Sequence, residues 1–81
     1  MRIIVFSDTH GDFFAAQTVF RQNRTADQFI FLGDGIAEVE EAAEELLPSP
    51  IWMVKGNGDY AAQAPLTRTA TFDGVRLWMT H

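Results

Sequence analysis

Cysteine is absent from this chain of 81 residues, and so is any apolar run of membrane-spanning length. Without cysteine no disulfide can support the small fold, and such a composition is typical of a reducing compartment. The apolar run Ile3–Phe6 is far shorter than a membrane span or the apolar region of a signal peptide. We therefore expect a cytoplasmic protein without a membrane segment.

Basic residues are scarce, because six Lys and Arg oppose eleven Asp and Glu and give a formal net charge of -5. This balance disfavours broad electrostatic binding to a nucleic-acid backbone. Several of the acids share one segment, and these are Glu38, Glu40, Glu41, Glu44 and Glu45. Their clustering predicts the solvated face of a helix rather than a binding site.

Hydrophobic residues make up 47% of the sequence, which suits one globular domain. Three continuous apolar runs, Ile3–Phe6, Phe29–Leu32 and Ile51–Val54, are typical of strands covered on both faces in a parallel sheet. Apolar residues at helical spacing predict helices over residues 12–24 and 36–47. The order β-α-β-α-β therefore predicts an α/β fold with right-handed crossovers.

Stop and turn signals organise the rest of the chain. Pro48 and Pro50 are expected to end the second helix. Two β-rich runs, Leu66–Phe72 and Val75–Thr80, are joined by an Asp-Gly pair, which predicts a tight β-hairpin. The residues expected on the buried face of its second strand are Val75, Leu77 and Met79.

The predicted elements leave apolar sheet surface that nothing in the sequence would cover. We therefore expect residues 1–81 to form a single partial domain, the first half of a larger α/β domain. An uncovered apolar face also predicts a homo-oligomer or a protein partner.

Polar residues of metal-ligand type follow each of the three predicted parallel strands. Asp8 and His10 follow the first strand, Asp34 follows the second, and Asn57 and Asp59 follow the third. Ligands bind at the carboxyl ends of parallel strands, so these groups should converge. Carboxylate, imidazole and amide groups without thiolate suit manganese, iron, zinc or magnesium in a reactive site. Asp34, on the middle segment, is the best candidate for a carboxylate that bridges two metals.

Each segment taken alone also has a purely structural interpretation. Asp8 or Asp12 could cap the first helix, and the Gly-Asp pair that contains Asp34 is a common turn. The Gly-Asn-Gly-Asp segment that starts at Gly56 is typical of a turn as well. Their joint occurrence after three successive strands favours a functional site.

This combination resembles the calcineurin-like metallophosphoesterases, and within them the small bacterial and archaeal phosphodiesterases. The motifs are Asp8-x-His10, Gly33-Asp34, Gly56-Asn57-x-Asp59 and a strand that ends in Thr80-His81. The resemblance implies a four-layer αββα sandwich, of which this chain is the N-terminal half. It also implies a dinuclear centre that hydrolyses a phosphate ester with a metal-bound hydroxide.

The resemblance further implies a role for each matching residue. By position, Asp8 and His10 are implied as ligands of the first metal, Asp34 as the bridging carboxylate, and Asn57 and His81 as ligands of the second metal. Manganese is the implied metal, with iron, zinc, nickel and magnesium as alternatives.

The chain departs from the family pattern in three places. Gly58 replaces a histidine that assists the leaving group, whereas Asp59, which would orient that histidine without binding metal, is retained. An ester with a good leaving group is therefore expected. Ala37 replaces a second aspartate, and the later Gly-His-x-His segment is missing, so metal binding should be weak. His81 is as compatible with a surface role as with a metal ligand.

The leading hypothesis is therefore a metal-dependent phosphoesterase, specifically a phosphodiesterase. The alternative is a non-catalytic protein-interaction scaffold on the same fold, which would have no physical need for an intact ligand set. A nucleotide-binding domain is disfavoured, because the first turn has no glycine-rich pattern and its two carboxylates would repel a pyrophosphate.

Overall fold

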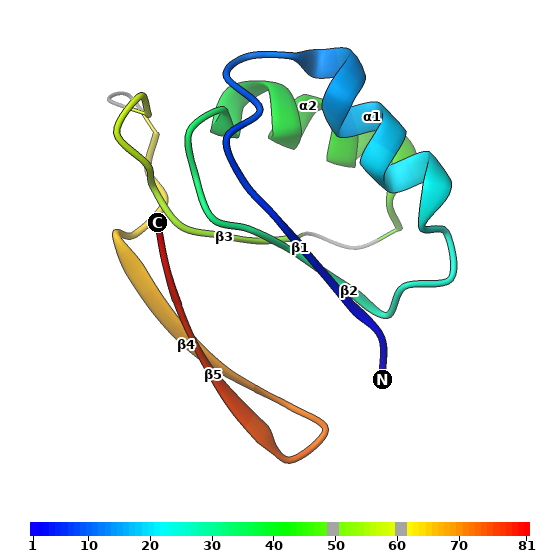
Figure 1. Ribbon diagram of the computed structural model, residues 1–81, viewed down its shortest axis with the longest axis vertical. Helices are drawn as coiled ribbons and strands as arrows, with labels where there is room; N and C mark the ends of the chain where they lie inside the picture. Colours follow the sequence, from blue (N-terminus) through cyan, green and yellow to red (C-terminus); the bar gives the residue numbers. More distant parts are fainter. Residues whose placement is uncertain (49–50, 60–61) are drawn as a thin grey trace.

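The computed structural model describes residues 1–48, 51–59 and 62–81. The elements in chain order are β1 (Ile3–Phe6), α1 (Phe13–Gln22), β2 (Gln28–Phe31), α2 (Ile36–Leu46), β3 (Trp52–Met53), β4 (Thr67–Phe72) and β5 (Val75–Thr80). They form three layers: two helices, a three-stranded sheet and a two-stranded hairpin (Figure 1). The predicted α/β fold with a hairpin after the third parallel strand is confirmed.

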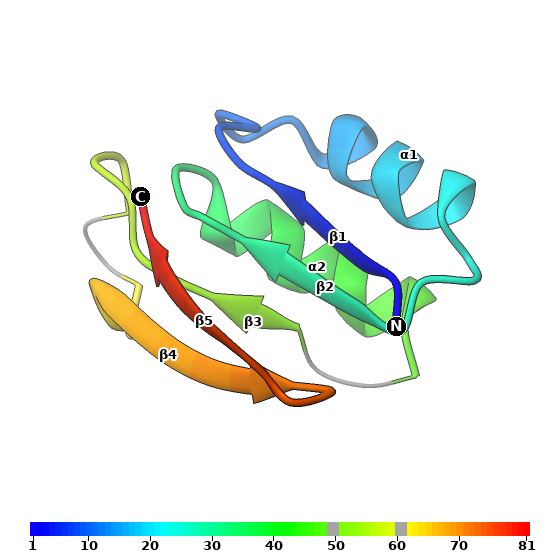
Figure 2. The same cartoon turned by 60° about the horizontal axis from the view of Figure 1, so that its bottom comes forward.

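The three-stranded sheet is parallel, with the strand order β1-β2-β3. Ile3 lies opposite Gln28 and Phe6 opposite Phe31, and Phe31 also lies opposite Met53 of β3. Because the strands run in the same direction, the loops that follow them lie together at the carboxyl ends of the strands, here called the carboxyl edge of the sheet. The end of β5 reaches the same edge (Figure 2).

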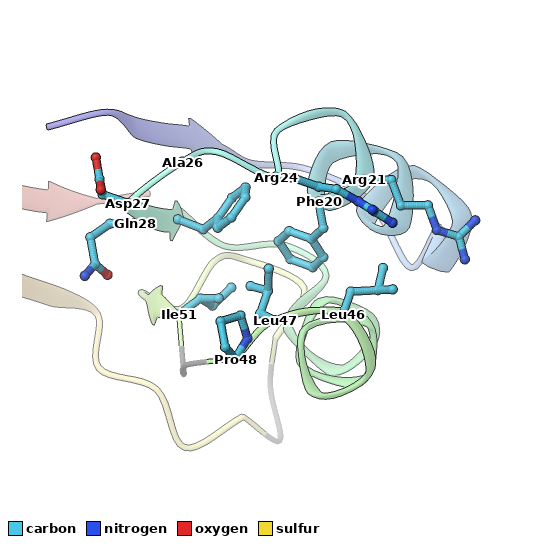
Figure 3. A pocket seen from close by; sticks show the side chains of 11 residues that line it. Phe20, Arg21, Arg24, Ala26, Asp27, Gln28, Leu46, Leu47, Pro48 and Ile51 are labelled. Carbon is cyan, nitrogen blue, oxygen red and sulfur yellow. The ribbon is translucent and has the colours of Figure 1, made fainter.

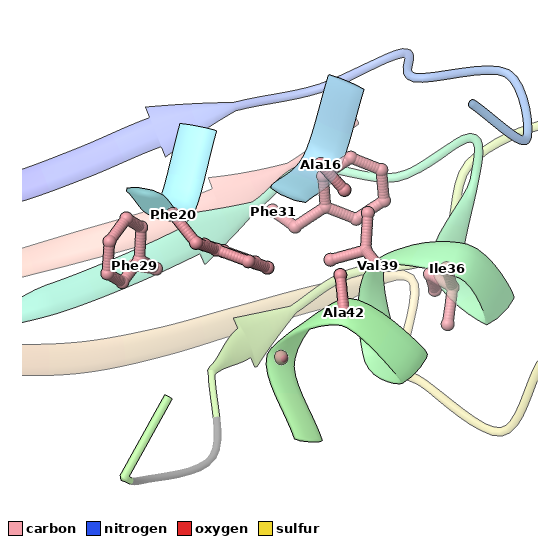
Figure 4. Packing of buried hydrophobic residues seen from close by; sticks show 8 residues of the cluster. Ala16, Phe20, Phe29, Phe31, Ile36, Val39 and Ala42 are labelled. Atoms are coloured by element: carbon pink, nitrogen blue, oxygen red, sulfur yellow. The ribbon is translucent and has the colours of Figure 1, made fainter. Parts of the chain in front are cut away.

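Both helices cover one face of this sheet, because each has an apolar side at helical spacing. The buried residues of this layer are Ala16, Phe20, Phe29, Phe31, Ile36, Val39, Ala42 and Ala43 (Figure 4). The rings of Phe20 and Phe29 meet edge to face with centroids 5.0 Å apart. Burying one such side chain contributes about 1.5–3 kcal/mol, so this layer fixes the sheet beneath the helices.

The β4–β5 hairpin packs on the opposite face of the sheet (Figure 1). The buried residues of this second core are Ile30, Val54, Phe72 and Met79. The guanidinium of Arg68 lies 4.3 Å from the ring centroid of Trp52, so the base of the hairpin also contacts β3 through a cation–π interaction.

The Asp-Gly turn has the expected backbone, because Asp73 and Gly74 both have positive φ, at 52° and 83°. Met79 is buried and Leu77 is partly buried, as predicted. The predicted burial of Val75 is wrong, since 60% of its surface is exposed. Val75 adjoins the turn, where the hairpin projects past the sheet (Figure 1).

Coverage of the parallel strands is uneven. β2 is covered by helices on one face and by the hairpin on the other. The expectation that β1 is covered on both faces is wrong in this chain, because Val5 is 53% exposed. The hairpin packs over β2 and β3 and leaves this part of β1 open.

The second helix matches its prediction in extent and in polarity. It ends at Leu46, and Pro48 follows closely, whereas Pro50 lies outside the described residues. The solvated face is confirmed for most of the predicted acids, since Glu38 is partly buried and the exposed ones are Glu40, Glu41, Glu44 and Glu45. In the part of the chain that the structure describes, neither helix has the length and apolar character needed to cross a membrane.

Candidate metal centre

Three of the candidate ligands converge at the carboxyl edge of the sheet. Single ligand atoms of Asp8, His10 and Asp34 all lie within 4.8 Å of one another. His10 Nδ1 lies 2.9 Å from Asp34 Oδ2, and His10 Nε2 lies 4.0 Å from Asp8 Oδ1. The loops after β1 and β2 thus bring together residues that are far apart in the sequence.

These three residues share a left-handed backbone conformation. The φ angles are 58° at Asp8, 50° at His10 and 73° at Asp34. Backbone hydrogen bonds hold the two loops together: Asp8 N donates to Gly33 O at 3.0 Å, and His10 N donates to Asp34 O at 3.0 Å. Positive φ is uncommon outside glycine and concentrates at functional sites, so the backbone itself marks this loop pair.

The helix cap and the candidate ligand are different aspartates. Asp12 is the N-cap of α1, and its side chain accepts a hydrogen bond from Ala15 N at 3.0 Å. Asp8 instead faces His10, and one of its oxygens accepts a hydrogen bond from Ser7 Oγ at 2.6 Å. Of the two capping candidates in the sequence, the structure selects Asp12 and leaves Asp8 available to a metal.

His81 reaches the same site from the end of β5. Its Nε2 lies 3.9 Å from Asp8 Oδ1, and its Nδ1 lies 2.6 Å from the carbonyl oxygen of Leu32. Since a carbonyl only accepts, Nδ1 donates this hydrogen bond, and Nε2 is the ring nitrogen that faces Asp8. Metal-binding histidines are commonly oriented in this way by a backbone carbonyl.

Asn57 occupies the exposed turn after β3. The next residue, Gly58, donates its N–H to Asp34 Oδ1 at 2.9 Å. This contact places the turn against the candidate bridging carboxylate. The two oxygens of Asp34 therefore face opposite sides, with Oδ2 toward His10 and Oδ1 toward the turn that carries Asn57.

Asp59 has a different environment, which the sequence did not indicate. It is 7% exposed, and its carboxylate accepts four backbone hydrogen bonds, from Asp34, Gly35, Ile36 and Gly56. Burial by itself would raise the pKa of Asp59, but these four N–H groups stabilise the charged form and lower the pKa to about 2. The carboxylate is therefore ionised at neutral pH.

Close backbone contact explains two of the glycines near this site. A Cβ added at Gly33 would lie 2.5 Å from the backbone N of Gly56, and one added at Gly56 would lie 2.5 Å from the backbone N of Asp34. The loops after β2 and β3 approach at this distance only without side chains. The absence of side chains at Gly33 and Gly56 thus permits the loop contact that Asp59 completes.

The donor set suits a divalent ion. Two carboxylates and an imidazole at this separation match the oxygen and nitrogen ligands of manganese, iron, zinc or magnesium in reactive sites. A cleft of about 610 Å³ opens beside His10 and Asp34, and Glu38 and Glu40 form part of its wall. The candidate ligands are therefore accessible from solvent.

The sequence model of the calcineurin-like phosphoesterase superfamily domain matches residues 1–81 of the chain. The chain belongs to this superfamily. A crystal structure of a conserved uncharacterized protein from Streptococcus pneumoniae TIGR4, described as a predicted phosphoesterase, matches with a TM-score of 0.70 and 32% sequence identity. That match covers 98% of this chain and 44% of the other one, so the chain spans less than half of its neighbour's length. A search of curated proteins gives no match.

Membership of the calcineurin-like phosphoesterase superfamily confirms the resemblance seen in the sequence. The resemblance also implied a histidine at position 58, where this chain has Gly58. A Cβ at this position would collide with Asp34 Oδ1. In the present arrangement the carboxylate of Asp34 occupies the space that a side chain at position 58 would need.

A second hollow lies at the opposite edge of the sheet (Figure 3). It has a volume of about 350 Å³ and lies between the C-terminal ends of α1 and α2. Its described lining is largely apolar, with Phe20, Phe29 and Leu46 among its residues, and it also includes Arg21 and Arg24. It contains none of the candidate metal ligands and is separate from the candidate metal centre.

Proposed function

We propose that this chain carries a metal centre of a phosphoesterase that hydrolyses a phosphate ester, in particular a phosphodiester. The observation that carries the proposal is the convergence of Asp8, His10 and Asp34 within 4.8 Å at the carboxyl edge of the sheet. Superfamily membership supports the same reaction class. Residues 1–81 would supply a partial domain of that enzyme, since the structural neighbour is more than twice as long.

Each candidate ligand has a proposed role. Asp8 and His10 would hold one metal ion, and Asp34 would bridge to a second ion held by Asn57 and His81. The opposed oxygens of Asp34 support its role as the bridge. Manganese is the proposed metal, and the same oxygen and nitrogen donors would also accept iron, zinc, nickel or magnesium.

Two divalent ions in such a centre would supply an activated water and neutralise charge on the phosphate. The chain's own contribution is to hold the ligands in place: Leu32 O orients the His81 ring, and Gly58 N fixes one oxygen of Asp34. No imidazole is available at position 58 to protonate a leaving group. Esters whose leaving group departs without a proton are therefore the proposed substrates.

The alternative of a non-catalytic scaffold explains less of the structure. A scaffold has no physical requirement for three ligand-type side chains that all have positive φ and converge on one point. Two further predictions rest on composition alone: that the protein is cytoplasmic, and that it does not bind a nucleic-acid backbone. A partner over the exposed apolar surface is compatible with either function.

The first test is manganese binding by the 81-residue chain, measured by titration calorimetry, with bis-nitrophenyl phosphate hydrolysis followed in parallel. Asp34→Ala should weaken binding by at least about 100-fold, since it removes a ligand outright. The matched control is Asp73→Ala, because Asp73 also has positive φ but lies in the hairpin turn. Equal affinities in wild type and Asp34→Ala would refute the metal centre.

A further inference from the structure

Asp59 carries a buried negative charge that hydrogen bonds stabilise without an opposite charge. Among the described residues, no Lys, Arg or His side chain forms an ion pair with it. Oδ2 accepts hydrogen bonds from Asp34 N at 2.6 Å and Gly56 N at 2.9 Å, and Oδ1 accepts from Gly35 N at 2.9 Å and Ile36 N at 3.0 Å. Every hydrogen bond of this carboxylate to a described residue is thus with the backbone of the segments that follow β2 and β3.

The backbone that Asp59 holds has an unusual conformation. Three successive residues have positive φ, with 101° at Gly33, 73° at Asp34 and 137° at Gly35. Glycine adopts such angles freely, but for Asp34 they are unfavourable and persist only when surrounding contacts impose them. The N–H groups of Asp34, Gly35 and Ile36 all donate to the carboxylate of Asp59, and these hydrogen bonds impose the backbone conformation.

This conformation determines where the carboxylate of Asp34 points. With the backbone held by Asp59, Gly58 N fixes Oδ1 at 2.9 Å and Oδ2 lies 2.9 Å from His10 Nδ1. Asp59 hydrogen-bonds to the backbone N of Asp34 and not to these ligand atoms. Its influence on them passes through the backbone of Asp34.

We propose that Asp59 is a positioning residue of the metal centre: its carboxylate binds the N–H groups of Asp34, Gly35 and Ile36 and so holds the left-handed turn that directs Asp34 at His10. Its effect on metal affinity rests on the proposed function, whereas its effect on the loop does not. The role differs from that of a residue that orients a neighbouring histidine, because Gly58 offers no such side chain.

The experiment compares Asp59→Ala and Asp59→Asn with Phe20→Leu, a core substitution near the opposite edge of the sheet. Binding of manganese chloride is measured by calorimetry at a temperature where all variants are folded. Amide hydrogen exchange is measured by NMR on the metal-free proteins. Asp59→Asn keeps a carbonyl oxygen as an acceptor and provides a milder variant if Asp59→Ala does not fold.

We expect Asp59→Ala to lower manganese affinity about 10- to 100-fold, the range found for residues that orient metal ligands. Asp59→Asn should give a smaller loss, and Phe20→Leu should bind like the wild type. A loss of affinity in Phe20→Leu equal to that in Asp59→Ala would overturn the proposal, because it would show an effect of stability alone. Unchanged affinity in a folded Asp59→Ala would overturn it too.

Hydrogen exchange separates this proposal from the proposed function. In the wild type the amides of Asp34, Gly35 and Ile36 should be protected, and Asp59→Ala should expose them while the α2 interior stays protected. If the wild type binds no manganese, the proposed function fails, and this exchange pattern still decides the role of the clamp. Rapid exchange of these three amides in the wild type would overturn the proposal that Asp59 holds this turn.

Discussion

At the scale of single residues, the candidate metal centre depends on backbone angles that few side chains tolerate. Asp8, His10 and Asp34 all have positive φ, and aspartate and histidine are among the non-glycine residues that tolerate this region best. Each such residue costs about 1–2 kcal/mol, which the surrounding hydrogen bonds must offset. The same loops could not close if Gly33 or Gly56 carried a side chain.

Gly33 and Gly74 provide a test of this close approach. Both have positive φ, but a Cβ at Gly33 would lie 2.5 Å from Gly56 N, whereas a Cβ at Gly74 would meet nothing within 4 Å. Gly74→Ala should cost about 1 kcal/mol from backbone strain alone, and Gly33→Ala should cost at least about 3 kcal/mol. Urea denaturation measures both losses. Equal losses would show that the loops after β2 and β3 are not in close contact.

At the scale of elements, each helix begins directly after a candidate ligand loop, so helix capping and ligand placement depend on neighbouring residues. Asp12 caps α1 from its own side chain, whereas α2 has no side-chain cap of its own at Gly35. Its first N–H groups are satisfied instead by Asp59 from the loop after β3. The start of α2 and the placement of Asp34 therefore depend on one distant carboxylate.

Asp12→Ala separates capping from metal binding. Removal of the N-cap side chain should lower the free energy of unfolding by about 1 kcal/mol, within the usual range for such caps. Manganese affinity should stay unchanged, since Asp12 bonds to Ala15 N and lies outside the three-residue ligand group. Asp12→Asn, which preserves a capping oxygen, should restore most of the stability. A large loss of manganese affinity in Asp12→Ala would mean that the ligand assignment in this loop is wrong.

At the scale of the whole molecule, the three layers leave apolar side chains in solvent. Those on the sheet and the hairpin include Val5 at 53% exposure, Val75 at 60% and Trp78 at 69%. Their exposure follows from the arrangement of layers, because the hairpin covers only part of the sheet and its own outer face is open. Exposed apolar surface of this kind favours association.

We therefore expect the 81-residue chain to self-associate at micromolar concentrations, as sedimentation equilibrium can measure. Trp78→Ser should weaken the association, because it removes a large apolar side chain from the hairpin face. Phe14→Ser is the matched control, since Phe14 is 76% exposed but lies on α1, on the other side of the molecule. A strictly monomeric wild type would contradict this prediction.

Local pattern and turn chemistry by themselves determined the elements of this protein. The run Ile3–Phe6 forms β1 with the predicted bounds, the Asp-Gly pair forms the predicted turn, and the apolar spacing along α2 gives its buried side. Each of these features depends only on residues that are close to one another in the sequence. The sequence therefore specified the β-α-β-α-β order and the edge of the sheet where the candidate ligands meet.

Tertiary structure alone decided how the loops contact one another. Only the folded chain shows that Asp59 binds the backbone of a loop 23 to 25 residues away, that Leu32 orients His81, and that Val5 remains open. No local pattern encodes these contacts, because each depends on the distance at which separate strands end beside one another. That distance is fixed by sheet pairing and by the packing of both layers against it.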